Sequence, residues 1–229
     1  MKEITYHSKK LGTVLIASEL NSVTIRTQRL EFRSLNQIAP VSLLTAYTNL
    51  LSDPENVALF GDGSPWDHER IKEYVTNDVK QRNSGASFGI FAVYHSESQK
   101  FIGTLEVTFV PDEYLQLGSG HANVAEISYV LDKSCWGQGY GTEMAIAAKK
   151  YIKHVVNELK NNASHIVPTE IVATVDPSNT GSKKILEKTL KNQEEEVFIK
   201  FGGKERILFF KPLHTPPTSE VHLDLTAKL

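Results

Sequence analysis

The sequence predicts a mixed α/β domain in which helices flank a mostly antiparallel central sheet. The hydrophobic patterns occur in the order strand, two helices, three strands, helix, strand, helix and two strands. The three middle strands follow one another with no helix between them, which argues against a doubly wound parallel sheet. With 229 residues, of which 40% are hydrophobic and 23% charged, the chain is long enough to bury an ordinary globular core.

Charge and cysteine content exclude several classes of protein. Twenty-five Lys and Arg stand against 27 Asp and Glu, a net charge of −2, so no global positive field would gather nucleic acid. The net charge does not exclude a local basic patch. The single cysteine excludes an intrachain disulfide and a Cys-rich metal site. No apolar stretch approaches the roughly 18 residues of a membrane span. We therefore expect a soluble cytoplasmic protein, a monomer or homodimer, with no nucleic-acid or membrane partner.

The first third of the chain contains an expected extension, one strand and two helices. Residues 1–22 are treated as an N-terminal extension, with Tyr6, Val14 and Ile16 as possible anchors. In residues 23–33, apolar and polar residues alternate sufficiently to predict one strand. Pro40 opens a helical pattern that ends before Pro54. The turn-rich loop FGDGSPW separates this helix from a second one over 67–81.

The remaining elements follow the same two periodicities. A hairpin is predicted around HSESQK, and the clearest helix follows the glycine cluster at 137–141, with apolar residues spaced by three and four. The other predicted strands and helices, in order, are strands 88–94, 101–110, 124–131 and 170–175, helix 177–190, and a closing hairpin of 197–201 with 206–210. The main domain is thus expected over 23–212, with 213–229 as a C-terminal tail.

The most informative stretch is AEISYVLDKSCWGQGYGTEMA, in which a strand, a glycine-rich loop and a helix follow one another. Backbone N–H groups at such a helix N-terminus suit a phosphate or diphosphate. A Walker loop requires Lys after the last glycine, but Thr142 and Glu143 follow Gly141. A dinucleotide fingerprint also fails, because Thr142 or Met144 stands where its third glycine belongs. A turn that merely uses glycines is the remaining alternative.

This loop resembles the acyl-CoA diphosphate loop of the GNAT superfamily, in which Q/R-x-x-G-x-G/A precedes a helix. The string WGQGYG at 136–141 fills the pattern, although Trp136 departs from it at the first position. The W-G-x-G-Y form is similar to that of the RimJ/RimL-like ribosomal-protein N-acetyltransferases.

Two further segments resemble the same branch. TIRTQRLEFRSL at 24–35 is similar to its opening T-x-R-L-x-L-R-x-L string. VDPSNTGSKKILEK at 175–188 is similar to its N-x-x-S-x-x-x-L-E-K segment, but Thr189 and Leu190 replace the usual Gly-Phe. The three segments occur in the family's order, so the resemblance implies a GNAT-like fold over 23–212.

The resemblance implies transfer of an acetyl group from acetyl-CoA to a primary amine, either a protein N-terminus or a small amine. The amine attacks directly, with a general base and no metal. The pantetheine arm is expected along the main chain of Tyr129, Val130 and Leu131, which also polarises the thioester oxygen. Asn179 is expected to bind the arm or, alternatively, to cap a helix. The diphosphate is expected to bind at Trp136, Gly137, Gln138, Gly139, Tyr140, Gly141 and Thr142.

Acyl transfer needs a base, because an amine with a pKa near 10 must lose a proton before it attacks. Glu126 is the candidate base; alternatively it attracts a cationic acceptor or pairs with an arginine. Glu106 and His121 are second choices. Many GNAT enzymes place a tyrosine near the leaving thiolate, but Leu186 occupies that position here. A serine at the position of Ser182 is the proposed acid in the branch that the sequence resembles, so the resemblance implies Ser182 as the acid.

Several other residues have an ordinary structural explanation beside a functional one. Lys183 and Lys184 could meet the 3′-phosphate of CoA or lie on a solvated helix face. Cys135 precedes a helix N-terminus, where the pKa of a thiol can fall and the thiol can act as a nucleophile. Direct attack by the amine needs no such covalent intermediate. The histidines show no H-x-x-x-H spacing, so no metal site is expected from them. The loop before the second helix contains acidic and aromatic residues that suit a cationic amine: Asp62, Trp66, Asp67 and Glu69. Alternatively, the acids start the helix and the tryptophan packs in the core.

Two function classes remain from these observations. The first is an active N-acetyltransferase. The alternative is a non-catalytic acyl-CoA-binding or sensing module, which would keep the loop and lack the base. A nucleotide-binding regulatory protein loses support because both phosphate-loop fingerprints fail.

Overall fold

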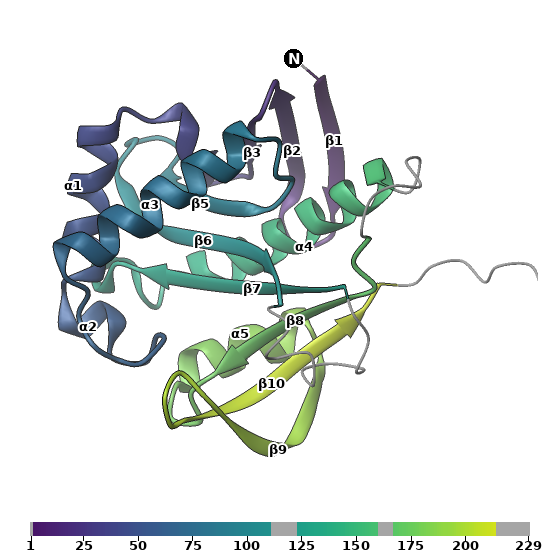
Figure 1. The fold of residues 1–229 in the computed structure, drawn as a ribbon. Coiled ribbons are helices and arrows are strands. Elements are labelled where there is room, and N and C mark those ends of the chain that lie inside the picture. Colours follow the sequence, from purple (N-terminus) through teal and green to yellow (C-terminus); the bar gives the residue numbers. More distant parts are fainter. Residues whose placement is uncertain (1, 111–122, 160–166, 214–229) are drawn as a thin grey trace, which may run out of the picture.

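A computed structural model describes residues 2–110, 123–159 and 167–213. Its strands form one sheet in the order β1-β2-β3-β4-β5-β6-β7-β8-β10-β9 (Figure 1). Neighbouring strands are antiparallel except β7 and β8, which are parallel. The mixed α/β, mostly antiparallel prediction is confirmed. The strands are β1 (Lys2–Ser8), β2 (Gly12–Glu19), β3 (Ser22–Arg26), β4 (Leu30–Ser34), β5 (Gly89–His95), β6 (Phe101–Phe109), β7 (Val124–Leu131), β8 (Glu170–Val175), β9 (Asn192–Lys200) and β10 (Lys204–Pro212).

Helices cover both faces of the sheet, and each face has its own apolar core. Helix α4 (Tyr140–Leu159) and helix α5 (Thr180–Thr189) pack on one face through residues such as Met144, Ile152 and Leu186. Helix α1 (Pro40–Leu51) and helix α3 (His68–Asn83) pack on the other face through Leu43 and Ile71. The short elements are α2 (Pro54–Val57) and the 3-10 turns η1 (Leu35–Gln37) and η3 (Lys133–Cys135).

The N-terminal segment that the sequence suggested as an extension is a β-hairpin joined to the sheet. β1 pairs with β2, and β2 continues the ladder to β3. Val14 and Ile16 are buried in the α4-side core. Tyr6 lies with its hydroxyl 2.9 Å from Nδ1 of His154 on α4. The three candidate anchors therefore all contact the body of the protein.

The prediction of one strand over 23–33 is wrong. The chain turns at Thr27–Arg29, and β3 and β4 form an antiparallel hairpin. The Thr27 hydroxyl accepts a hydrogen bond from Leu30 N at 3.2 Å and donates one to Glu143 of α4 at 2.6 Å. The alternation runs through this turn without a glycine or proline, so the sequence pattern carries no sign of it.

Most other predicted elements are confirmed within one to three residues. Helix α1 has the expected start at Pro40, and Asp67 caps α3 by accepting a hydrogen bond from Arg70 N at 2.8 Å. Strands β7 and β8 have the expected bounds. Helix α5 begins at Thr180 rather than Pro177, because Asn179 caps it through a 2.9 Å hydrogen bond from Ser182 N. The predicted connection 111–121 lies outside the described residues.

Candidate active site

Strands β7 and β8 separate part-way along their length. Their parallel ladder contains Val124↔Glu170, Ala125↔Ile171 and Glu126↔Val172. Beyond Glu126, β7 remains paired with β6 as far as Leu131, whereas β8 pairs with β10. Figure 1 shows the two strands diverging from their common end. The backbone edge of 127–131 that faces this gap can accept an extended ligand by strand-like hydrogen bonding.

The glycine loop stands between the free end of β7 and the first turn of α4. Gly137 and Gly139 have φ values of 74° and 82°, in the left-handed region that favours glycine. Trp136 is half-exposed, and its indole N–H donates to Leu131 O at 2.9 Å. These turns place successive backbone N–H groups at the N-terminus of a 20-residue helix, where an anion is favoured.

Arg29 and Glu143 brace this loop. The carboxylate of Glu143 is only 2% exposed and accepts hydrogen bonds from Arg29 Nε at 2.8 Å and Arg29 N at 3.1 Å. Arg29 Nη1 donates to Gln138 O at 2.9 Å, and its guanidinium lies 4.6 Å from the Tyr140 ring centre. The turn between β3 and β4 therefore holds the loop from outside.

Two hydroxyl groups meet between β7 and α5. The Tyr129 hydroxyl lies 2.9 Å from Ser182 Oγ. Burial raises the pKa of Tyr129 to about 12, so the phenol stays protonated near neutral pH. Leu186 is buried, and no phenol stands at its position. Asn179 uses Oδ1 to cap α5, which leaves its NH2 group outside that hydrogen bond.

Glu126 is held in an ion pair that the sequence did not predict. Lys200 Nζ donates to both carboxylate oxygens, at 2.7 and 2.9 Å, and Thr174 Oγ1 lies 3.3 Å from Oε1. The side chains of Glu126 and Lys200 are 13% and 4% exposed. The alternative of a cationic partner for Glu126 thus has geometric support, with a lysine in place of the arginine considered.

Glu106 has a different environment on the neighbouring strand. The Tyr74 and Ser128 hydroxyls each donate to its Oε2 at 3.1 Å. Burial raises the pKa of Glu106, and the two hydrogen bonds oppose this shift only in part. The negative charge of Glu126 raises it further. Glu106 therefore combines a raised pKa with hydroxyl partners, whereas Glu126 is tied to a cation.

The loop before α3 and the β9–β10 hairpin meet beside these carboxylates. Arg206 donates to the carbonyl of Gly61, and also to Asp176 Oδ2 at 2.9 Å. Trp66 is buried and lies edge-on to Tyr74, with ring centres 5.1 Å apart. The other acidic candidates act locally: in the loop, Asp62 accepts from Ser64 N and Arg70 and Asp67 caps α3, and in the first turn of α3, Glu69 pairs with Lys72.

The remaining candidate residues have other positions than the carboxylates and hydroxyls described above. His121 lies outside the described residues. Cys135 is buried at the end of η3. Lys183 and Lys184 lie on the first half of α5. In the described ranges, no three His, Cys, Asp or Glu side chains are grouped in a way that could hold a metal ion. No helix in these ranges has the length and hydropathy of a membrane span.

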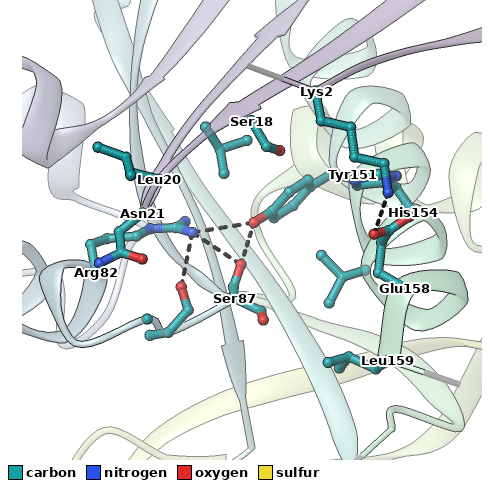
Figure 2. A pocket seen from close by; sticks show the side chains of 14 residues that line it. Lys2, Ser18, Leu20, Asn21, Arg82, Ser87, Tyr151, His154, Glu158 and Leu159 are labelled. Carbon is teal, nitrogen blue, oxygen red and sulfur yellow. Dashed lines mark hydrogen bonds and ion pairs between the residues drawn. The ribbon is translucent and has the colours of Figure 1, made fainter. Parts of the chain in front are cut away.

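A separate hollow of about 190 Å³ lies at the other end of α4 and contains none of the predicted site residues. Figure 2 shows Arg82 at its edge, with one guanidinium nitrogen directed at Tyr151 and Ser87. This nitrogen lies 3.2 Å from the Tyr151 hydroxyl and 3.0 Å from Ser87 O. Lys2 and Glu158 pair at the opposite side, 2.6 Å apart. These contacts join β1, α3 and α4.

Comparisons with known proteins match this chain to acetyltransferases. The family model described as "Acetyltransferase (GNAT) domain" matches residues 29–189. A sequence relative, "Uncharacterized N-acetyltransferase p20" of Bacillus licheniformis, is 29% identical over 168 residues, which are 71% of this chain and 79% of the relative.

Solved structures show the same fold. A GNAT-family acetyltransferase from Bacillus anthracis superposes with a TM-score of 0.57 at 22% identity, over 82% of this chain and 95% of that one. The ribosomal L7/L12 α-N-protein acetyltransferase RimL, in complex with coenzyme A, superposes with a TM-score of 0.56 at 14% identity. That match covers 81% of this chain and 95% of RimL.

Proposed function

Because the chain belongs to the GNAT acetyltransferase family, we propose that it moves an acetyl group from acetyl-CoA to a primary amine by direct attack. The observation that carries this proposal is the separation of β7 from β8 after Glu126. The gap begins beside two carboxylates and lies along the strand that leads into the glycine loop. A thioester arm laid along 129–131 would present its diphosphate to the loop and its acyl group to the carboxylates.

In this proposal the loop amides around Gly137–Gly141 bind the diphosphate, with the dipole of α4 behind them. Strand β7 supplies main-chain hydrogen bonds to the pantetheine arm. A β7 N–H group in the segment Tyr129–Leu131 polarises the thioester oxygen as negative charge develops on it. Asn179 contributes its side-chain NH2 group to the arm while Oδ1 caps α5.

Glu106 is the base that we favour for the incoming amine. Its raised pKa brings it nearer to the operating pH, and its hydroxyl partners do not neutralise it. Glu126, the base favoured from the sequence, has both carboxylate oxygens bonded to Lys200 Nζ, so an external amine would have to displace Lys200 to reach it. Glu126 instead contributes negative charge to the acceptor side of the gap.

Ser182 is the donor to the leaving thiolate, and Tyr129 positions it. When the phenol donates to Ser182 Oγ, the serine proton is free to point at the sulfur atom. A hydrogen bond to the thiolate stabilises it as the carbon–sulfur bond breaks.

Acetyl-CoA binding and thiol release test the function separately. Binding is measured by calorimetry and thermal unfolding; saturation at 100 times the dissociation constant should stabilise the fold by about 2.7 kcal/mol. Thiol release is followed with three amine classes: a peptide with a free N-terminus, a polyamine and an aminoglycoside. The proposal requires binding and release with at least one class. Binding without release would support the non-catalytic acyl-CoA-binding module instead.

A further inference from the structure

Lys200 reaches across the end of the sheet to the candidate active site. It lies at the end of β9, which two strands, β8 and β10, separate from β7. Its Nζ nevertheless lies 2.7 Å from Oε1 of Glu126 on β7. The β9–β10 hairpin must therefore bend toward β7 at this end, and Figure 1 shows β9 strongly curved beside β10. The Lys200 side chain is 4% exposed, so its amine is enclosed there.

The position of this amine coincides with the start of the gap. Glu126 is the last β7 residue that pairs with β8. Thr174, two residues beyond Val172 on β8, lies 3.3 Å from the same carboxylate oxygen as Lys200 Nζ. The amine is thus held where the strands part, which is the end of the gap toward which the proposed function directs the acyl group. A bound acceptor would present the same group, a primary amine, at this location.

We propose that Lys200 is itself an acetyl acceptor and that the protein N-acetylates it within its own chain. This inference rests on the proposed function. The Lys200 ammonium first gives one proton to the Glu126 carboxylate. The neutral amine nitrogen then attacks the acetyl carbonyl carbon and forms a C–N bond. The C–S bond breaks, CoA leaves as the thiolate and takes up one proton, and the second amine proton passes to solvent.

Proximity favours this reaction over acetylation of exposed lysines. An amine held beside the carbonyl reacts as an intramolecular group, with effective molarities far above the concentration of any solution amine. The reaction is a single event per chain, because acetyl-lysine no longer attacks. It also removes the positive charge of Lys200 and so releases Glu126 from that ion pair. Self-acetylation would thereby alter the charge of the acceptor side of the site.

The test is to incubate the full chain with acetyl-CoA and no added amine, and then to measure intact mass and peptide masses. We expect one acetyl group per chain, located on Lys200, with occupancy at least about tenfold above that of Lys204, because only Lys200 is held at the gap. Lys204 is the internal comparison, since it is exposed and lies four residues away. The rate per chain should not depend on protein concentration.

Two controls make the outcome decisive. Lys200→Arg keeps a cation beside Glu126 but cannot form the same product, so the mass gain should disappear while acetyl-CoA still stabilises the fold. Protein unfolded in urea should acetylate Lys200 and Lys204 equally. If Lys200 stays unmodified, or gains no more than Lys204, while acetyl-CoA binds and amines are acetylated, self-acetylation is wrong and the proposed function stands. If acetyl-CoA does not bind at all, both fail.

Discussion

Glu106 and Glu126 lie on neighbouring strands, but their partners differ. Glu106 accepts from two hydroxyls and Glu126 pairs with Lys200. Glu106→Gln should lower kcat/KM about 100-fold, the usual contribution of a general base, and leave acetyl-CoA binding unchanged. Because a base must be deprotonated and burial raises the pKa of Glu106, activity should fall with decreasing pH at a higher pH than for an ordinary carboxyl.

The matched control is Glu126→Gln, which makes the same isosteric change in the carboxylate on the neighbouring strand. Its effect on kcat/KM should be smaller than that of Glu106→Gln. The opposite order would return the role of base to Glu126.

The Tyr129–Ser182 contact predicts a coupled pair of effects on kcat. Ser182→Ala should lower kcat about 100-fold by removing the donor to the thiolate. Tyr129→Phe should lower kcat about tenfold, equivalent to one hydrogen bond. Because the phenol acts through Ser182, adding Tyr129→Phe to Ser182→Ala should cause no further loss. Independent, additive losses in this double-mutant cycle would contradict the positioning role.

Asp78 predicts a pH-dependent stability away from the site. Its buried carboxyl accepts from Ile90 N at 2.7 Å, and burial raises its pKa to about 6. The folded state therefore holds the proton more tightly than the unfolded state, so stability falls as pH rises from about 4 to 6, by about 3 kcal/mol. Asp78→Asn keeps the acceptor oxygen and should remove the contribution of Asp78, so the slope in urea unfolding becomes smaller, while Glu106, whose pKa burial also raises, keeps its own contribution. A slope unchanged by the substitution would assign it to another group.

Among the residues of the site, the sequence indicated carboxylates and the serine but not their partners. The sequence indicates a role for the main chain of Tyr129 but none for its phenol. In 197–201, Val197, Phe198, Ile199 and Phe201 are all apolar, so alternation does not select an inward face. Val197 and Ile199 are exposed, whereas Phe198 packs on a small buried cluster and Lys200 is buried. Lys200 is enclosed through its ion pair with Glu126 on β7, a long-range contact that a local pattern does not show.

At the scale of elements, the β1–β2 hairpin should contribute to global stability. Ile16 is 1% exposed in the α4-side core. Ile16→Ala should cost about 2–5 kcal/mol in the free energy of unfolding, the range for buried aliphatic truncations. Leu20→Ala is the control, because Leu20 is 99% exposed in the turn that follows β2. Equal urea midpoints for the two variants would show that the hairpin is not part of the cooperative fold.

Elements with a single strong periodicity were predicted well, and those defined by long-range contacts were not. Helix α1 and strands β7 and β8 have their expected bounds because apolar spacing and flanking turn residues agree. The β3–β4 turn depends on Glu143, 116 residues from Thr27. Such a contact has no local signature. The membership of β1 and β2 in the sheet likewise depends on pairing with β3.

For the whole molecule, the sheet connects the site to both cores. Helix α4 and helix α5 support the loop and Ser182 from one face, while α3 supplies Tyr74 to Glu106 from the other. The strand order and the three family-like segments together made this architecture predictable. The carboxylate partners required the three-dimensional arrangement of β6, β7 and β9.

The most direct test of the account is a crystal structure of the protein with acetyl-CoA. We expect the diphosphate within hydrogen-bond distance of the backbone N–H groups at 137–141. The arm should lie beside 129–131 in the gap between β7 and β8, with the sulfur near Ser182 Oγ and the acetyl group near Lys200 Nζ. Ligand density elsewhere, with side chains filling this gap, would contradict the central claim.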